Sequence, residues 1–479
     1  MHWIDASIFI LYMVALLCIG YYFLKKNKST EDFFVSGRNM SGWHIGLSVV
    51  ATDVGGGFSI GLGGLGFLMG LSGSWMLFTG LIGAWLSAVI LIPRVHPLGD
   101  SHRFTTFPQL FSLFYNKNVA LVAGIISAIG YLGFTSSQIL AGAKLASASF
   151  IALDLETALW VMGIVTILYT VMGGMTAVIY TDTVQWIVLM GGLIFIGIPL
   201  GYNAIGGWDA IKSTLDPSFL SLSNITWPTL VNWAVTIIPI WFVGMTLYQR
   251  IFASRSKKEA QKAWFIAGLF EWPLMAFMGV LLGLFSRVAA EQGMFVDLGF
   301  ASAEGMDPEL GLPLLLRQIL PIGLMGIMLS AYFSAILSTA DSCLMAASGN
   351  FLTDILQRIF PGLHLHPKVL RLTQVLTFSL GMLAILLATQ MENVLDLMLY
   401  SYAFMVSGLF IPLVAALFFK QKNPYAAMSS MIVGGGTTLL LTILETPLPF
   451  GLDPNIFGIT AALFAFIIVT YLFKKKYTL

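Results

Sequence analysis

The sequence predicts an all-α protein that crosses a membrane about thirteen times, and three observations lead to this fold class. The 479 residues are 57% hydrophobic and have a mean hydropathy of +0.87. Only 10% are charged, against about 25% in soluble domains, so the chain cannot cover a soluble surface of this size. The apolar residues also form runs of roughly 20 without a period-2 pattern, which favours membrane helices over strands.

Thirteen apolar runs are long enough to cross the hydrocarbon core of a bilayer. They lie near 3–24, 43–70, 73–93, 119–150, 156–172, 175–201, 229–249, 264–287, 319–349, 371–390, 394–419, 426–445 and 455–473. The first run is preceded by no basic stretch and is followed by lysines, so we expect a helix rather than a cleaved signal peptide. Residues 1–479 are therefore predicted to be a single transmembrane domain.

Basic residues give the predicted orientation. Twenty of the 24 Lys and Arg fall in segments that the thirteen-span assignment places inside. Only Lys212, Arg287 and Arg317 fall outside, and the long outer segment 288–316 is acidic. This bias predicts an external N-terminus and an internal C-terminus.

Five of the charged residues within the predicted spans form a short list of functional candidates, because a charge inside a membrane helix costs at least ~2.5–3.5 kcal/mol on insertion and is expected to have a role. They are Asp53, Lys144, Asp182, Glu271 and Asp341. Lys144 and Asp182 could snorkel or cap a helix near the membrane surface, and a structural role is expected for Glu271 beside Trp272. The surroundings of Asp53 and Asp341 favour function.

Asp53 precedes three consecutive glycines, Gly55 to Gly57, which weaken a helix at mid-depth. Close packing through small residues is the alternative interpretation. A second candidate break, at Pro239 and Gly244, lies five spans later. Two interrupted spans at corresponding places in two halves are typical of transporters with an inverted repeat and a binding site at the membrane midplane.

Asp341 lies in a cluster with Ser338, Thr339 and Ser342. Ser338, Asp341 and Ser342 share one helix face by their i,i+3 and i,i+4 spacing. Each hydroxyl could instead bond to a carbonyl of its own helix. Oxygen ligands without His or Cys favour a hard cation, and the low ligand charge favours a monovalent one. The cluster therefore predicts a monovalent cation site.

Other chemistries have little support in the sequence. The chain has no phosphate-binding loop and no paired-His zinc helix, so direct ATP coupling is not indicated. The sequence shows no nucleophile–base pair, which argues against an enzyme. It also shows no soluble output domain, which argues against a receptor or sensor. The net charge of +1 gives no argument for nucleic acid, and Cys18 and Cys343 imply no disulfide framework.

Several segments together carry a family resemblance. Residues 33–38 read FFVSGR, residues 173–185 read GGMTAVIYTDTVQ, and residues 335–342 read AILSTADS. With Gln249-Arg250 and Thr353-Asp354, they resemble the sodium/solute symporter family, which includes bacterial sodium/proline, sodium/galactose and sodium/sialic acid transporters.

The resemblance implies the leucine-transporter fold, an inverted repeat of five plus five helices. Residues 3–24 would form an extra N-terminal helix and 43–201 the first repeat. Residues 229–419 would form the second repeat and 426–473 two C-terminal helices.

The resemblance also implies sodium ligands. The backbone carbonyls of the main site fall on Ala51, Val54 and Ala335, and its hydroxyls fall on Ser338 and Thr339. A second cation site found in some members falls on Asp182, Ser338, Asp341 and Ser342. At Asp341 this sequence departs from the serine of two-sodium members, which leaves the number of sodium ions open and allows a proton instead.

Further positions are implied as substrate-binding or gate residues. They are Asp53, Gly55, Gly56, Ser136, Gln138, Trp241, Phe242 and Tyr248. Helix packing is the alternative role for the aromatic residues. Sialic acid is disfavoured, because the hydroxyls that bind its carboxylate would fall on Gly55 and Phe58.

The expected function is uptake of a small organic solute with sodium as coupling ion, by alternating access. An amino acid such as proline, or a small carboxylate, is the preferred solute. The alternatives are a proton-coupled symporter that uses Asp53 or Asp341, a sodium/sugar symporter and, remotely, a membrane receptor or sensor. Expected partners are the solute and the lipid bilayer of a bacterial inner membrane, without nucleic acid or an obligatory protein partner.

Overall fold

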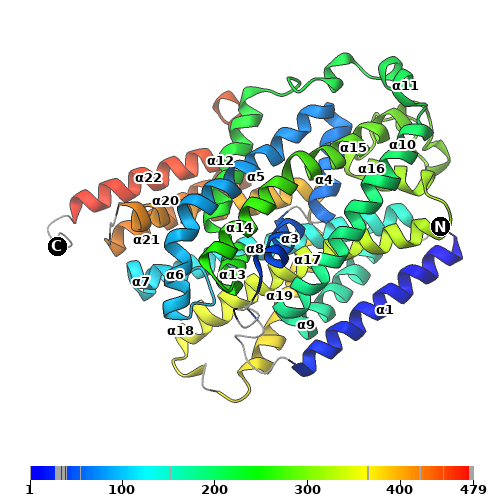
Figure 1. The fold of residues 1–479 in the computed structure, drawn as a ribbon. Coiled ribbons are helices and arrows are strands. Elements are labelled where there is room, and N and C mark those ends of the chain that lie inside the picture. Colours follow the sequence, from blue (N-terminus) through cyan, green and yellow to red (C-terminus); the bar gives the residue numbers. More distant parts are fainter. Residues whose placement is uncertain are drawn as a thin grey trace.

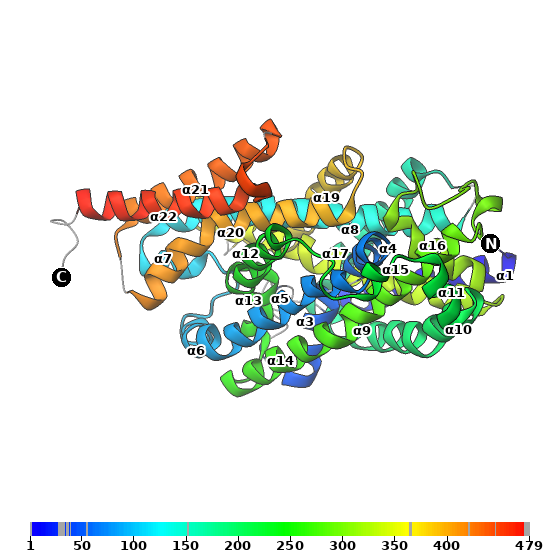
Figure 2. The ribbon, with the colours of Figure 1, turned by 90° about the horizontal axis from the view of Figure 1, so that it is seen from above.

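The computed structural model describes residues 2–26, 34, 38, 40–53, 56–150, 153–363, 366–419, 422–445 and 447–473. Within these ranges, the side chains of 23–26, 53, 56–59 and 174–183 are not described. In the described ranges the backbone is mainly helical, and its β-contact is a single isolated bridge between Met40 and Ser254. The prediction of an all-α membrane protein is confirmed (Figures 1 and 2).

The helices follow one another along the chain with short π and 3₁₀ turns between several of them. They are α1 (Trp3–Lys26), α3 (Gly42–Asp53), α4 (Gly56–Met69), α5 (Trp75–Leu86), α6 (Ile92–His102), α7 (Gln109–Phe114), α8 (Lys117–Ser149), α9 (Leu155–Gly192), α10 (Ile198–Ala204), α11 (Gly207–Thr214), α12 (Trp227–Val243), α13 (Met245–Ala253), α14 (Lys257–Leu269), α15 (Ala276–Glu291), α16 (Pro308–Ile319), α17 (Leu324–Gly349), α18 (Gln357–Ile359), α19 (Val369–Ala388), α20 (Val394–Phe418), α21 (Pro424–Leu444) and α22 (Pro454–Leu472). The π-helical segment η8 (Asn350–Leu356) continues α17.

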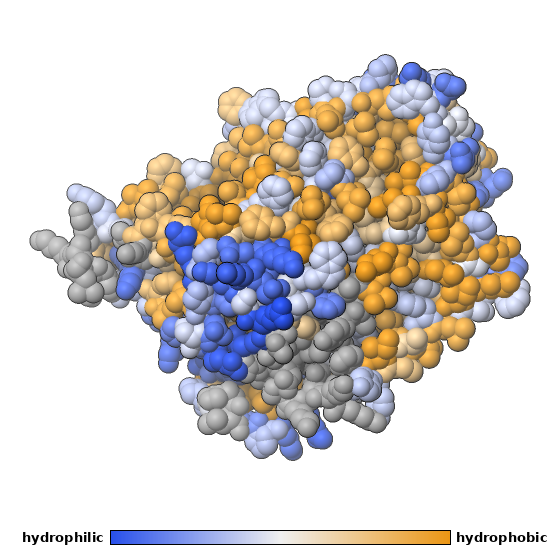
Figure 3. Space-filling view, in the orientation of Figure 1, coloured by the Kyte–Doolittle hydropathy of each residue, from blue (hydrophilic) through white to orange (hydrophobic). Residues whose placement is uncertain are grey.

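Eleven helical segments in the described part of the chain are long and apolar enough to cross a membrane, or twelve when α12 and α13 count as one bent span. On the face that Figure 3 shows, hydrophobic residues cover much of the surface, while hydrophilic residues gather near α6, α13 and α14. Among these segments, the one that contains α17 is the most enclosed by the rest of the protein. In its 18-residue apolar stretch 94% is buried, against 22% in the corresponding stretch of α22. The candidate cation cluster therefore lies on the central helix of the bundle.

The N-terminal helix α1 caps α17. Asp5 is buried, and its Oδ1 accepts hydrogen bonds from the backbone N–H groups of Gly323, at 2.7 Å, and Gly326, at 2.9 Å. No side chain of α17 caps its own first turn, so the carboxylate of α1 satisfies these donors. Further along α1, the Tyr12 hydroxyl donates to Ser334 Oγ. Thus α1 fixes the helix that carries the cation cluster.

Replacing Asp5 tests this capping. Asp5→Ala is expected to lower the free energy of unfolding by about 1–2 kcal/mol, because two helix-terminal N–H groups lose their acceptor. Asp5→Asn keeps an acceptor oxygen and is expected to lose less. Unfolding of the purified variants in detergent measures both effects, and equal stability of Asp5→Ala and the unmodified protein would contradict the capping role.

Candidate functional site

The first half of the predicted sodium site comes together where α3 meets α17. Thr339 Oγ1 lies 2.9 Å from the carbonyl oxygen of Ala51 and 3.2 Å from that of Ala335. All three residues are at most 2% exposed. Two residues 288 positions apart in the chain thus present oxygens to one buried point.

The remaining predicted ligands of this site are placed less completely. Ser338 is buried on the same turn of α17 as Thr339. Val54 lies outside the described residues. The candidate ligand atoms that are described are neutral oxygens in a buried place. Such a set suits a monovalent cation better than a softer or more highly charged metal. A cation held there would join α3 to α17.

The two predicted helix breaks have different outcomes. α3 ends at Asp53 and α4 begins at Gly56, but residues 54–55 lie outside the described residues, so unwinding at this point stays a prediction. The second break is confirmed at Gly244: α12 and α13 meet there at 40°, and Gly244 has extended backbone angles. Pro239 lies within α12, so the break falls at the glycine.

Asp341 is fully buried and faces α9. Its Oδ1 accepts a hydrogen bond from the Thr170 hydroxyl. Thr170 could not be predicted as a partner of Asp341, because a single hydroxyl in an apolar run has no distinguishing pattern. It lies twelve positions before Asp182 on the same helix. The side chain of Asp182 is among those that are not described, so its place in a second cation site stays a prediction.

Ser342, another residue of the predicted second site, contacts Arg250. The Arg250 side chain is fully buried, and its Nη2 donates to Ser342 Oγ at 2.9 Å and to Thr52 Oγ1. Its Nε donates to Ser48 Oγ at 3.2 Å. Because like charges repel strongly in a buried site, a cation bound at Ser342 requires the guanidinium to move away. The sequence had placed Arg250 only in a motif, without a role.

The predicted gate aromatics make packing contacts. Trp241 is fully buried and lies edge-to-face with Trp264, at 6.2 Å between ring centroids. The Tyr248 hydroxyl donates to the carbonyl of Phe242 at 2.7 Å, across the bend between α12 and α13. The rings of Phe242 and Phe410 lie edge-to-face, with 5.9 Å between their centroids. Packing and a gating role are compatible, because the bend is held by these contacts.

The polar residues predicted for the substrate pocket lie buried on α8. The Ser136 hydroxyl donates to the Leu132 carbonyl of its own helix at 2.9 Å. Gln138 Nε2 donates to Ser137 Oγ at 3.3 Å. The Gln138 Oε1 has no hydrogen-bond partner in the part of the chain that is described. The side chain of Asp53, Gly55 and the surroundings of Gly56 lie outside that part, so their contribution to a substrate site stays a prediction.

Two other charges within the spans are held by specific contacts. Lys144 Nζ lies 2.6 Å from Asp307 and 2.7 Å from Glu309, so it is paired rather than snorkelling. Glu309 also accepts 3.0 Å hydrogen bonds from the backbone N–H groups of Val394 and Leu395 at the start of α20. Glu271 is fully buried and packs closely against Gly80 of α5. A Cβ atom at position 80 would lie only 2.3 Å from Glu271 Oε2, so this contact requires glycine there.

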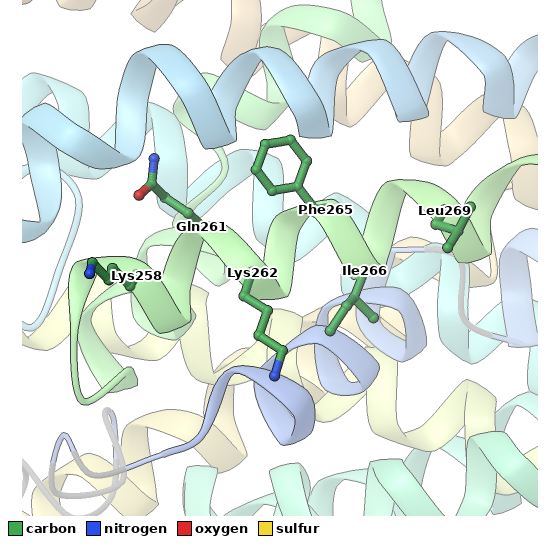
Figure 4. A pocket seen from close by; sticks show the side chains of 6 residues that line it. All are labelled: Lys258, Gln261, Lys262, Phe265, Ile266 and Leu269. Atoms are coloured by element: carbon green, nitrogen blue, oxygen red, sulfur yellow. The ribbon is translucent and has the colours of Figure 1, made fainter.

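A groove on α14 lies away from these residues. It has a volume of about 480 Å³ and carries lysines at one end and apolar side chains at the other (Figure 4). The groove is lined by Lys258, Gln261, Lys262, Phe265, Ile266 and Leu269. None of the predicted sodium or substrate residues lines it, so it is a surface feature rather than the substrate site.

Comparison with known proteins shows the family of the chain. A model of the sodium:solute symporter family matches residues 33–434, and the chain belongs to this family.

Individual relatives extend over nearly the whole chain. The chain is 27% identical to the high-affinity proline transporter PutP of Bacillus subtilis over 440 residues, which cover 89% of each protein. It is 26% identical to the osmoregulated proline transporter OpuE of Bacillus subtilis over 479 residues, or 97% of this chain and 94% of that protein. A solved structure of a Na⁺-coupled sialic acid symporter in a substrate-bound outward-open state has the same fold, with a TM-score of 0.80, 22% identity and 98% coverage of both chains.

Membership of the family settles the broad function. The chain is a multi-pass membrane transporter that couples sodium to the movement of a small-molecule solute. Sodium is its coupling ion, and its relatives are transporters rather than enzymes.

Proposed function

We propose that the protein carries a small amino acid such as proline into the cell, driven by the inward sodium gradient. The buried contact between Thr339 and the Ala51 carbonyl carries the proposal, because it gives sodium a place between two helices. The names of the two Bacillus relatives support an amino acid with proline-like chemistry. A small carboxylate is the second candidate, and a sugar follows it.

In this mechanism, sodium binds to Ala51, Val54, Ala335, Ser338 and Thr339. The ion stabilises the conformation in which α3 and α17 are joined and the solute pocket opens outward. Moving one charge through 100 mV contributes about 2.3 kcal/mol. Conformations that differ by a few kcal/mol are shifted substantially by such a contribution. When the inner side opens, sodium leaves and the solute follows.

A second cation site is proposed at Asp182, Ser338, Asp341 and Ser342. The hydrogen bond from Thr170 to Asp341 supports it, since it brings the α9 helix of Asp182 against the acid on α17. The contact of Ser342 with Arg250 means that occupation of this site is linked to movement of α13. A proton on Asp341 is the alternative to a second sodium.

We propose thirteen spans with the N-terminus outside and the C-terminus inside. The segment Ile60–His102 has 43 residues, enough for parts of two spans. The contacts of α9 with α1 support two antiparallel spans within α9. Just before α9, Phe150 contacts Phe9 in the first half of α1, and Met172 of α9 lies against Gly20 in the second half of α1. Further along α9, Val188 lies beside the first half of α1 again. The start of α1 and the end of α22 lie at opposite ends of the molecule (Figure 1), as an odd number requires.

This topology fits the five-plus-five arrangement. The repeats are proposed at 43–201 and 229–419, preceded by the helix at 3–24 and followed by two helices at 426–473. A bacterial inner membrane is the proposed location, where the protein acts without an obligatory protein partner.

A ligand panel tests the substrate. Purified protein in detergent is heated with amino acids, small carboxylates or sugars, each with sodium or with an equal concentration of choline. Proline is expected to raise the unfolding temperature only when sodium is present, because ligands that bind the folded state stabilise it by mass action. Stabilisation by a carboxylate or sugar alone would reassign the substrate. Uptake driven by a pH gradient in sodium-free buffer would favour the proton-coupled alternative.

A further inference from the structure

A cavity lies at the end of the molecule where α7 and α18 are found (Figure 1). None of the predicted sodium ligands lines this cavity. It has a volume of about 260 Å³ and is lined by residues of α7, the start of α8, η8 and α18. A water molecule takes about 30 Å³, so the cavity admits a group of several heavy atoms. The lining includes one acid, Asp354, and two bases, Lys117 and Arg358.

Asp354 is the buried member of this set. The residue is 7% exposed, and its Oδ1 accepts a 3.0 Å hydrogen bond from the Thr106 hydroxyl. Its Oδ2 is buried and has no hydrogen-bond partner among the residues that the structure describes. A Cβ on Gly124 would lie 2.6 Å from the Asp354 Cβ, so the side chain is held in place. A buried carboxylate oxygen is costly unless a donor or a positive charge meets it.

The bases give the cavity a second kind of recognition. Lys117 is exposed and Arg358 is half-buried, so both lie nearer to the surface than the acid does. Arg358 Nη2 donates to Asn118 Oδ1 at 2.8 Å, which holds the guanidinium beside the start of α8. Two cations near the surface attract an anionic group, while Asp354 attracts an ammonium group. The complementary ligand is therefore a zwitterion.

The surroundings of the cavity indicate a lipid as the source of this zwitterion. Large apolar side chains are exposed on the neighbouring α7 and around the end of α18: Leu113 at 41%, Ile359 at 56% and Phe360 at 60%. Such exposure suits contact with acyl chains. We propose that the cavity binds the headgroup of phosphatidylethanolamine, with its phosphate at Lys117 and Arg358 and its ammonium at Asp354.

The site also lies close to the bent helix pair α12 and α13. Thr106, which donates to Asp354, is followed by Phe107, whose ring lies 4.5 Å from Tyr248 on α13. The backbone N–H of Phe107 lies 3.1 Å from Met245 Sδ. A bound headgroup would thus hold the loop that packs against the second half of the bent pair.

Retention of lipids by the full-length protein tests the proposal without any transport assay, so its outcome is independent of the proposed substrate. Protein in nanodiscs of phosphatidylcholine with added phosphatidylethanolamine or phosphatidylglycerol is released and weighed by native mass spectrometry. Phosphatidylethanolamine is expected to be retained preferentially. Asp354→Asn is expected to reduce its retention at least about tenfold, because hydrogen bonds to charged groups are stronger than neutral ones.

Controls separate this site from general lipid contact. Lys117→Gln, at an exposed position, is expected to reduce retention as well, and it serves if Asp354→Asn does not fold. Lys258→Gln with Lys262→Gln alters the α14 groove, which has lysines but no acid among its lining residues, and should leave retention unchanged. Equal retention of the three lipids, or unchanged retention in both cavity variants, would overturn the proposal. Displacement of the lipid by excess free proline would show that the zwitterion is a soluble amino acid instead.

Discussion

Thr339→Val is expected to raise the sodium concentration needed for half-maximal stabilisation or uptake by about tenfold to a hundredfold. Valine keeps the shape of threonine but removes the hydroxyl that lies between the carbonyls of Ala51 and Ala335. An interaction with a charged group contributes about 1.5–3 kcal/mol, which corresponds to this range. Sodium titration of the unfolding temperature measures the change, and Ser338→Ala with Thr339→Ala should enlarge it.

Thr166→Val is the matched control for this experiment. Thr166 is also a buried threonine, but its hydroxyl donates to the Met162 carbonyl of its own helix at 2.8 Å. The control should therefore keep the sodium dependence of the unmodified protein. If Thr339→Val titrates with sodium as the control does, the hydroxyl is not a ligand and the site assignment is wrong.

Lys144→Met is expected to lower the free energy of unfolding by about 3 kcal/mol or more. The Lys144 ammonium lies between Asp307 and Glu309, and the side chains of Lys144 and Glu309 are only 3% and 7% exposed. Removing one partner of a buried ion pair leaves an uncompensated charge, which costs about 3–5 kcal/mol. Glu309 also accepts from two N–H groups of α20, so the damage is expected to reach the start of that helix.

The ion pair between Arg255 and Glu259 provides the comparison. These groups are 3.5 Å apart, and the Arg255 side chain is 56% exposed, so Arg255→Met should change stability by less than about 1 kcal/mol. In Lys144→Met with Glu309→Gln, part of the loss should be recovered because the more deeply buried of the two carboxylates that lose Lys144 is then neutral. Unfolding by a denaturing detergent measures the stability of the unmodified protein and of the three variants. Equal stability of Lys144→Met and Arg255→Met would contradict the buried pairing.

Much of the fold follows from the sequence because membrane helices obey strong constraints. The bend at Gly244 was predictable, since glycine after an apolar run weakens a helix that no water supports. The partner of Lys144 was not, because Asp307 and Glu309 lie more than 160 positions away in a predicted outer segment. Hydropathy describes how each helix meets the bilayer, but it does not say which helices touch.

The candidate site shows the same division. The cluster at Ser338–Ser342 was visible as hydroxyls and an acid on one helix face, and the resemblance supplied Ala51, whose carbonyl lies 2.9 Å from Thr339. A backbone carbonyl has no signature in residue type, so composition alone could not find it. The Arg250 network with Ser342 also escaped prediction, because it depends on the place where the bent helix directs a long side chain.

The most direct test of the account locates the ion itself. Thallium can replace a monovalent alkali ion and scatters strongly, so a structure of the protein with thallium in place of sodium should show its position. We predict a peak between the carbonyl oxygens of Ala51 and Ala335 and the hydroxyl of Thr339, which is lost in Ser338→Ala with Thr339→Ala. A peak elsewhere that persists in the double variant would contradict a sodium-linked junction of α3 and α17.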